Sequence, residues 1–142
     1  HIQAAKEVNL PLIVHTREAI KDTMSIMQEE SAADAGGIMH CYVEDLDNAK
    51  LAMDMNFMIS FSGIVTFKSA KDLQVVAKEI PDEYLLIETD SPYLAPMPFR
   101  GKPNQPAYVL HVAEFLAELR GTTVEHIAEI SSNNFKRLFS LS

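Results

Sequence analysis

The run LPLIVHTR at residues 10–17 decides the predicted fold, because it joins a short apolar strand to reactive polar side chains. A proline lies near its start, β-branched and other apolar residues fill it, and His15, Thr16 and Arg17 close it. A run of about four to eight such residues is typical of a strand buried in a parallel sheet. Three later runs share this form: GIMHC at residues 37–41, FMISF at 57–61 and YLLIE at 84–88.

Helical patterns separate these four runs. Apolar residues recur at helical spacing in residues 18–30, 45–55 and 68–79. His15 and His40 are 25 residues apart, a spacing that fits one βαβ unit. Further helical patterns and a proline-rich loop complete the chain: helices at residues 1–9, about 107–119 and about 123–139, and the loop at 91–106. The sequence therefore predicts an α/β fold with a parallel sheet.

Polar groups at the strand ends distinguish a barrel from a small open sheet, a choice that the spacing alone leaves open. Reactive side chains close each run: His15 and Arg17, His40 and Cys41, Ser60 and Ser62, Glu88 and Asp90. In a (β/α)₈ barrel the active site lies at the carboxyl ends of the strands. Four such units predict one half of a (β/α)₈ TIM barrel, a single partial domain over residues 1–142. The helical pattern at residues 1–9 has no N-cap, so we expect the N-terminal half of the barrel to precede it.

Composition and charge restrict the class of protein. Of the 142 residues, 47% are hydrophobic and 23% are charged, the balance of a soluble globular protein. No apolar stretch reaches the roughly 20 residues of a membrane-spanning helix, so no membrane partner is expected. The single cysteine, Cys41, excludes an internal disulfide and fits the reducing cytoplasm. With a net charge of −8, binding to nucleic acid would require a local basic cluster and metal ions.

His15, His40 and Asp90 are the candidate metal ligands. Two imidazoles and a carboxylate at strand ends suit Zn²⁺, Mn²⁺ or a similar divalent ion. For one histidine alone, a hydrogen-bonded residue at a strand end is the more common explanation. Three such residues at one end of the same sheet favour a metal site. Cys41, which strand alternation turns away from His40, is expected to be a small buried side chain without a catalytic role.

Glu88 and Asp90 are the candidate catalytic groups. They stand at positions i and i+2, which places both carboxylates on the same side of an extended strand. One carboxylate could bind metal or accept a proton from the attacking water, while the other orients a neighbouring group. The spacing supports equally well a strand end at which Asp90 caps the following turn.

Arg17, Arg100 and Lys102 are the basic residues that the sequence places near these strand ends, and Asn104 follows closely. A guanidinium group holds phosphate oxygens through paired hydrogen bonds. These four residues are therefore the predicted phosphate-binding groups. For any one of the three cations, a solvated surface charge is the more common role.

Five ordered motifs in this chain resemble the TatD family of metal-dependent deoxyribonucleases, which have an amidohydrolase-like TIM barrel. The motifs are PLIVHTREA at residues 11–19, GIMHC at 37–41, ISFSG at 59–63, ETDSPYLAP at 88–96, and RGK at 100–102 followed by Asn104. NNF and RLF, at residues 133–135 and 137–139, resemble the last helix of that family. Together the motifs cover almost the whole chain and resemble the C-terminal half of the barrel, about strands five to eight.

The resemblance implies a function and a set of roles. His15 and His40 would match metal-binding histidines on strands five and six. Asp90 would match a metal ligand on strand eight that also acts as the base. The groups around the substrate phosphate would be Arg17, Arg100 and Asn104. The implied reaction is hydrolysis of DNA with two divalent ions, which could be Mg²⁺, Mn²⁺ or Zn²⁺.

Two alternative functions stay open at this point. A metallohydrolase of the same superfamily could act on an amide, ester or lactone, but no lysine ends a strand to form a carboxylated bridge, and Arg100 and Lys102 favour phosphate. A non-catalytic interaction fragment is the second alternative, which the set of His15, His40 and Asp90 opposes. A half barrel leaves two sheet edges and an apolar face uncovered. We therefore expect the chain alone to be inactive and to need the N-terminal half or self-association.

Overall fold

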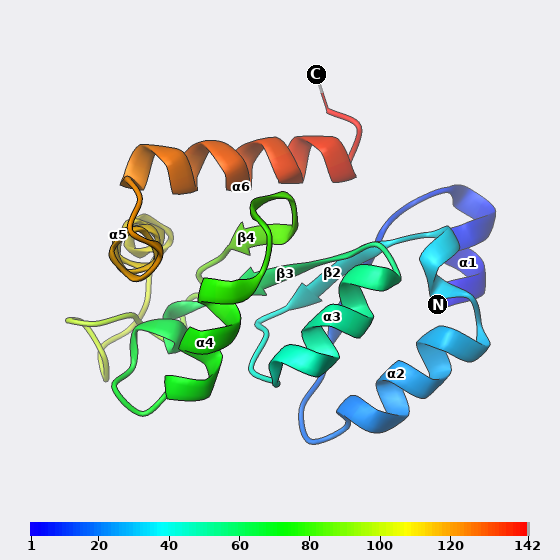
Figure 1. The fold of residues 1–142 in the computed structure, drawn as a ribbon, viewed down its shortest axis with the longest axis horizontal. Helices are drawn as coiled ribbons and strands as arrows, with labels where there is room; N and C mark the ends of the chain where they lie inside the picture. The colour runs from blue at the N-terminus through cyan, green and yellow to red at the C-terminus, as the bar shows by residue number, and fades with distance from the viewer. Residues whose placement is uncertain (142) are drawn as a thin grey trace.

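A four-stranded parallel sheet organises the computed structural model, which describes residues 1–141 (Figure 1). The strands are β1 (Leu12–His15), β2 (Gly37–His40), β3 (Phe57–Phe61) and β4 (Leu85–Ile87). They lie in the order β1-β2-β3-β4, and each pairs in parallel with the next. The predicted α/β fold with a parallel sheet is therefore confirmed.

Helices connect the strands and cover the sheet. The α-helices are α1 (Ile2–Val8), α2 (Ile20–Glu29), α3 (Leu46–Asp54), α4 (Lys71–Glu79), α5 (Val109–Arg120) and α6 (Val124–Leu138). Short 3₁₀ helices are η1 (Ala32–Asp34), η2 (Gly63–Thr66), η3 (Asp82–Tyr84) and η4 (Pro106–Tyr108). In Figure 1, α3 and α4 lie on one side of the sheet and α6 lies on the other. Within residues 1–141, no helix has the length and apolar character needed to cross a membrane.

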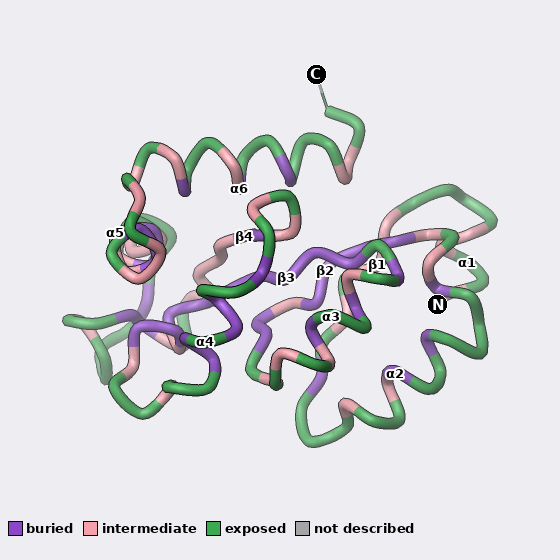
Figure 2. Tube along the Cα trace, viewed as in Figure 1, coloured by how far each residue is buried: buried purple, intermediate pink, exposed green. Residues whose placement is uncertain are grey.

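The main hydrophobic core lies between the sheet and helices α2 to α5 (Figure 2). Alternate residues of β3 contribute Phe57, Ile59 and Phe61 to it, all fully buried. Met58 is also buried but faces the other way, in a smaller cluster whose other members are Ile38, Leu86, Leu138 and Phe139. Strand β3 is thus covered on both faces, which explains its continuous apolar sequence.

Strand β1 lies at an edge of the sheet and has one exposed face. Its residues alternate between half-buried and exposed, and Ile13 is 64% exposed. Close pairing with β2 requires glycine at position 37, because a Cβ on Gly37 would lie 2.1 Å from the Leu12 carbonyl oxygen. Among the described residues, no strand pairs with the outer edge of β1. One of the two open edges expected from the sequence is therefore present.

The outer edge of β4 is not open as expected, because helix α6 supplies its hydrogen-bond partners. The Ile87 N–H donates to Ser131 Oγ over 3.1 Å, and Asn134 Nδ2 donates to the Leu85 carbonyl over 2.9 Å. Ser131 and Asn134 are buried, about one helical turn apart. Their side chains take the positions that backbone groups of a neighbouring strand would take. Of the two edges, only that of β1 is open in the described part of the chain.

Capping residues mark the starts of α3 and α6 and the end of α5. The Asp45 carboxylate accepts the Asn48 N–H over 2.8 Å at the start of α3. The Thr123 hydroxyl accepts the His126 N–H over 3.1 Å at the start of α6. Gly121 ends α5 with a φ of 66°, a left-handed conformation that glycine adopts without strain. The 3₁₀ helices were not predicted, since turns of three or four residues leave no periodic pattern in the sequence.

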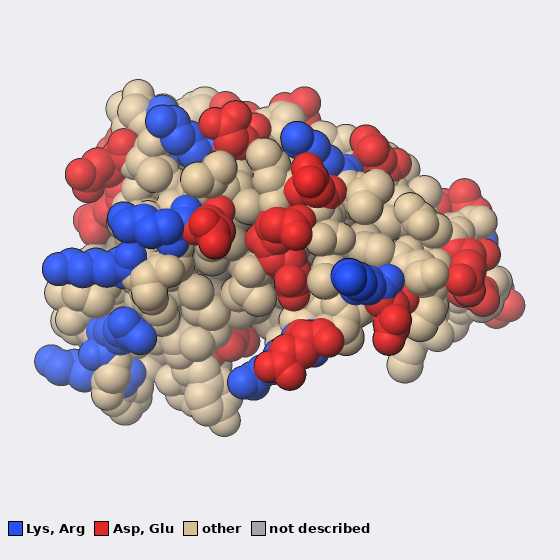
Figure 3. Space-filling model, turned by 60° about the horizontal axis from the view of Figure 1, so that its bottom comes forward, with Lys and Arg blue, Asp and Glu red and all other residues tan. Residues whose placement is uncertain are grey.

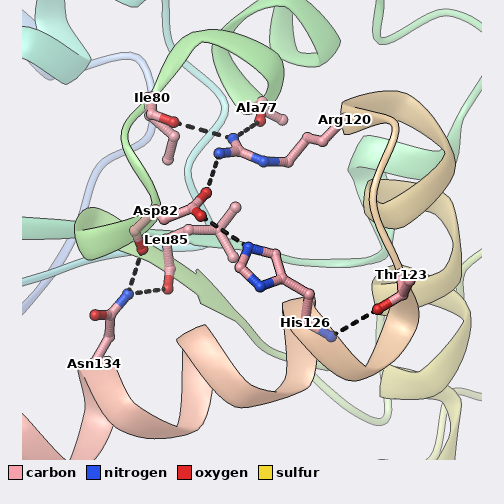
Figure 4. A network of polar contacts seen from close by, with 8 residues as sticks. All are labelled: Ala77, Ile80, Asp82, Leu85, Arg120, Thr123, His126 and Asn134. Atoms are coloured by element: carbon pink, nitrogen blue, oxygen red, sulfur yellow. Dashed lines mark hydrogen bonds and ion pairs between the residues drawn. The ribbon is translucent and has the colours of Figure 1, made fainter.

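A polar network at the amino-terminal end of β4 joins α5 and α6 to the sheet (Figure 4). Asp82 accepts a hydrogen bond from Arg120 over 2.5 Å and contacts His126 Nε2 over 2.8 Å. Arg120 also donates to the carbonyls of Ala77 and Ile80. The hydrogen bond with His126, and then the contacts with Arg120, lower the pKa of Asp82 below its ordinary value. One carboxylate thus links two helices to the start of β4.

Asp82→Asn is expected to destabilise the protein by about 1 kcal/mol at neutral pH, because the amide has no charge to pair with Arg120. A lowered folded-state pKa stabilises the fold above the unfolded value of about 3.9, and this stabilisation is lost as pH falls through the folded pKa. Urea unfolding curves of the intact wild type and variant should therefore converge below about pH 4. The exposed Asp54→Asn is the control. A difference that stays constant into strong acid would contradict an electrostatic origin.

Candidate metal centre

His40, Glu88 and Asp90 meet at the carboxyl end of the sheet. His40 is the last residue of β2, and the two carboxylates follow β4, with β3 between these strands. Each of the three residues offers one ligand atom, and these atoms lie within 4.8 Å of one another. Because parallel strands end at the same edge of a sheet, residues 48 positions apart in sequence come into contact.

The His40 ring is held between two carboxylates. Its Nδ1 lies 2.9 and 3.0 Å from the two oxygens of Glu88, of which only Oε2 has hydrogen-bond geometry. Its Nε2 faces Asp90 Oδ1 at 3.4 Å. A histidine that is hydrogen-bonded to a carboxylate through one nitrogen presents the other as a metal ligand. This geometry suits Glu88 as the orienting group, with His40 Nε2 and Asp90 as the ligating pair.

The donor set fits a divalent cation. Two ligand atoms of a tetrahedral ion with bonds of about 2.0–2.1 Å lie roughly 3.3 Å apart, and Nε2 of His40 and Oδ1 of Asp90 are separated by 3.4 Å. In addition, Glu88 Oε1 is buried and has no hydrogen-bond partner among the described residues. An unpaired carboxylate oxygen in a buried position is unfavourable. A cation beside it would compensate its charge.

His15 lies beside this group rather than within it. It pairs in register with His40, and the centres of the two rings are 5.7 Å apart. His15 is exposed, and so is Arg17 two residues further on. Of the three ligands predicted from the sequence, the structure brings His40 and Asp90 together and places His15 next to them. Glu88, predicted as a catalytic group, completes the cluster.

The turn after β4 differs from the extended strand that the sequence predicted. Strand β4 ends at Ile87, and Asp90 has a φ of 57°, in the left-handed region. The alternation of an extended strand therefore does not explain how Glu88 and Asp90 both reach His40. The left-handed backbone at Asp90, three residues after the end of the strand, instead accompanies the placement of its carboxylate beside His40 Nε2. Non-glycine residues in this conformation are uncommon and concentrate at functional sites.

The proline-rich loop that follows Asp90 packs against η2, the turn after β3. Gly63 makes this contact possible, because a Cβ there would lie 2.0 Å from the Leu94 carbonyl oxygen. The Thr66 hydroxyl accepts the Met97 N–H over 2.8 Å. The long loop predicted from the sequence is therefore held to η2 by specific contacts.

Asn104 closes the base of this loop and is only 6% exposed. Its Nδ2 donates to the carbonyls of Thr89 and Tyr93 over 2.7 and 2.6 Å. Its Oδ1 accepts the Gln105 N–H over 2.9 Å. Both amide hydrogens are therefore engaged. The phosphate contact predicted for Asn104 would require one of these bonds to break.

Arg100 and Lys102 are exposed on the same loop, next to aromatic rings. The Arg100 guanidinium lies 4.4 Å from the centre of the Phe67 ring, and Lys102 Nζ lies 5.9 Å from that of Phe99. Phe99 stacks on Tyr108 with their centres 4.2 Å apart. Figure 3 shows Lys and Arg side chains gathered at the end of the molecule that carries this loop. The contact between Arg100 and Phe67 was not predicted, because the two residues are far apart in the sequence.

Cys41 is not part of the reactive group. It is buried, and its Sγ lies 3.2 Å from Ser62 Oγ. Burial raises the pKa of the thiol to about 11, so the thiol stays protonated at neutral pH. This agrees with the small buried side chain expected from the sequence. His111 and His126 contact carboxylates elsewhere in the fold.

Comparison with known proteins identifies the family of this chain. The model of the family described as TatD related DNase matches residues 1–140. Over 141 residues the chain is 52% identical to YcfH of Escherichia coli strain K12 and 54% identical to YabD of Bacillus subtilis strain 168, both described as uncharacterized metal-dependent hydrolases. These matches cover 99% of the chain but 53% and 55% of the relatives. The chain thus spans about half the length of the curated relatives it matches.

Solved structures agree with this fold. The crystal structure of YjjV, a TatD homologue from Escherichia coli K12, superposes with a TM-score of 0.90 at 28% sequence identity and covers 99% of this chain and 54% of that chain. A TatD family hydrolase from Entamoeba histolytica superposes with a TM-score of 0.85 at 18% identity, again over 99% of this chain and 54% of the other. At that identity the second match supports the fold alone.

Glu88→Gln is expected to weaken the binding of Mn²⁺ on the order of 10- to 100-fold, because glutamine is uncharged and orients His40 less firmly. Asp90→Asn, which removes a ligand, should weaken binding at least as strongly. Isothermal titration calorimetry on the intact protein measures both effects. Glu114→Gln, which changes a half-exposed glutamate outside the cluster, is the control. Equal Mn²⁺ affinities in Glu88→Gln and the wild type would contradict the orienting role.

Proposed function

The chain belongs to the TatD family of metal-dependent hydrolases, and on this basis we propose that the intact protein hydrolyses phosphodiester bonds of DNA. The observation that carries the proposal is the cluster of His40, Glu88 and Asp90, followed directly by a loop that exposes Arg100 and Lys102. Metal-dependent hydrolysis follows from the family. DNA as the substrate is the proposed part, and the family description as a DNase supports it.

His40 and Asp90 hold one divalent ion in this proposal, and Glu88 fixes the ring of His40. His15, on the neighbouring strand, contributes to a second ion together with groups from outside this chain. When bound, Mg²⁺, Mn²⁺ or Zn²⁺ supplies a Lewis acid for a phosphoryl oxygen. Imidazole and carboxylate donors suit these ions.

Asp90 is the proposed general base. Its Oδ1 faces His40 Nε2, which leaves Oδ2 to accept a proton from the attacking water. Glu88 Oε2 is engaged with His40 Nδ1, so Glu88 orients rather than accepts the proton. The two carboxylates selected from the sequence as catalytic groups thus take different parts in the reaction.

Arg17, Arg100 and Lys102 are proposed to bind phosphate groups of the DNA strand. All three are exposed. Stacking on Phe67 holds the Arg100 guanidinium in place while its N–H edge can still donate to phosphate oxygens. A protein with a net charge of −8 needs basic side chains near its site to bind a polyanion.

The chain is further proposed to form strands five to eight of a TIM barrel. Strand β1 has an open edge, and a cavity of about 760 Å³ lies between α6 and the face of the sheet opposite the main core. Its lining is mainly apolar and includes Ile13, Leu86 and Phe135. The N-terminal half of the barrel would cover this face and add the remaining metal ligands, and a second copy of the chain is the alternative cover.

The single cysteine, Cys41, is free, which supports a cytoplasmic location.

The intact protein is expected to cleave single-stranded DNA when Mg²⁺ or Mn²⁺ is present, and Asp90→Ala should lower kcat at least about 100-fold. The variant lacks both a ligand and the base. Gel analysis of an end-labelled oligonucleotide, with and without EDTA, measures cleavage. Asp54→Ala, at the exposed end of α3, is the matched control. Tight metal binding without DNA cleavage would indicate an amide, ester or lactone substrate, and absence of metal binding would favour a non-catalytic role.

Residues 1–142 produced alone are expected to show no nuclease activity and to self-associate, because the apolar face and the β1 edge stay uncovered. Addition of the N-terminal half of the Escherichia coli relative YcfH, as a separate polypeptide, should restore metal-dependent cleavage. Light scattering after size-exclusion chromatography measures the association. Cleavage of DNA by monomeric residues 1–142 would refute the half-barrel proposal.

A further inference from the structure

We propose that Asn104 is a positioning residue that holds Asp90 in its metal-binding position and does not contact the substrate phosphate. The proposal rests on the metal site proposed above. It replaces the phosphate contact that the sequence suggested for this residue. Asn104 follows Thr89 by 15 residues, yet its side chain reaches back to the end of β4 and touches the backbone there.

The amide of Asn104 restrains the peptide group that precedes Asp90. Asn104 Nδ2 donates to the Thr89 carbonyl over 2.7 Å. This carbonyl and the Asp90 N–H belong to one planar peptide unit. A hydrogen bond to the oxygen therefore restrains the orientation of the N–H and of the bond about which φ of Asp90 is measured.

Asp90 needs such a restraint because its backbone conformation is unfavourable. Its φ of 57° lies in a region that residues with a Cβ seldom adopt. Such conformations persist only where the surroundings enforce them. The Asp90 carbonyl accepts the Tyr93 N–H over 2.9 Å, which closes a turn over residues 90–93. If the restraint is lost, Asp90 can relax, and its Oδ1 no longer has a fixed position 3.4 Å from His40 Nε2.

Three further hydrogen bonds fix Asn104 itself. Its second amide hydrogen is donated to the Tyr93 carbonyl over 2.6 Å. Its Oδ1 accepts the Gln105 N–H, and its own backbone N–H donates to the Pro92 carbonyl, each over 2.9 Å. The residue is 6% exposed. The Asn104 amide is buried, and both of its hydrogens are donated to the backbone. Such a side chain is better suited to joining two chain segments than to binding a ligand.

Thr66, in η2, offers a matched control because it binds the same loop at another point. Its hydroxyl accepts the Met97 N–H over 2.8 Å and so fastens the loop further from the metal ligands. Thr66→Val removes this bond and keeps the shape of the side chain. Asn104→Leu likewise keeps approximate size and neutrality but removes both donors to the base of the loop. The two variants therefore distinguish the effect of the hydrogen bonds next to Asp90 from the effect of attaching the loop in general.

Titration of the intact protein with Mn²⁺, by calorimetry and without any substrate, tests the proposal. Asn104→Leu is expected to weaken Mn²⁺ binding on the order of 10- to 100-fold, and Thr66→Val by no more than about twofold. Asn104→Ser keeps one donor and should lie between Asn104→Leu and the wild type. It also provides the measurement if circular dichroism shows that Asn104→Leu does not fold. A higher concentration of Mn²⁺ should restore kcat of the Asn104 variants, with little change in KM for DNA.

Each other outcome would overturn the proposal in a recognisable way. Unchanged Mn²⁺ affinity with a raised KM for DNA would assign Asn104 to the phosphate instead. Equal weakening by the Asn104 and Thr66 variants would indicate general loosening of the loop. A wild-type protein that binds no Mn²⁺ would refute the metal site and this proposal with it. Because the titration needs no substrate, failure to cleave DNA would refute only the proposed substrate.

Discussion

Parallel pairing of the four strands is the constraint on which the site depends. The register places His15 opposite His40, and β3 carries the alignment across to β4. Residues from separate βαβ units then share one edge of the sheet. A shift of β2 by one residue would turn His40 towards the face covered by the helices and away from Glu88 and Asp90. The apolar pattern that buries Met39 therefore also determines where the imidazole points.

The strands and helices could be predicted because buried strands and amphipathic helices leave different periods in a sequence. The proximity of His40 and Asp90 could be predicted for the same reason, since both stand where an apolar run ends. The contact between Glu88 and His40 could not. It depends on the path of the chain directly after β4 ends at Ile87, and this path has no clear local signal in the sequence.

Side-chain contacts with distant backbone groups are the other part that the sequence did not reveal. Asn104 binds the Thr89 carbonyl and Asn134 binds the Leu85 carbonyl, across 15 and 49 positions. An asparagine has the same donors whether it binds a ligand or the backbone of its own chain. Only the tertiary fold decides which partner it meets. The sequence alone therefore does not distinguish an asparagine that binds phosphate from one that anchors its own loop.

The hydrogen bonds from α6 to β4 limit how copies of this chain can join. A sheet with two free edges can add a molecule at each side, and repeated addition leads to fibres. Because Ser131 and Asn134 occupy the outer edge of β4, each copy offers one free edge in its described part, at β1. Pairing through that edge alone would be complete with two copies. Two polar side chains on one helix would thus keep edge-to-edge pairing from continuing along a row of copies.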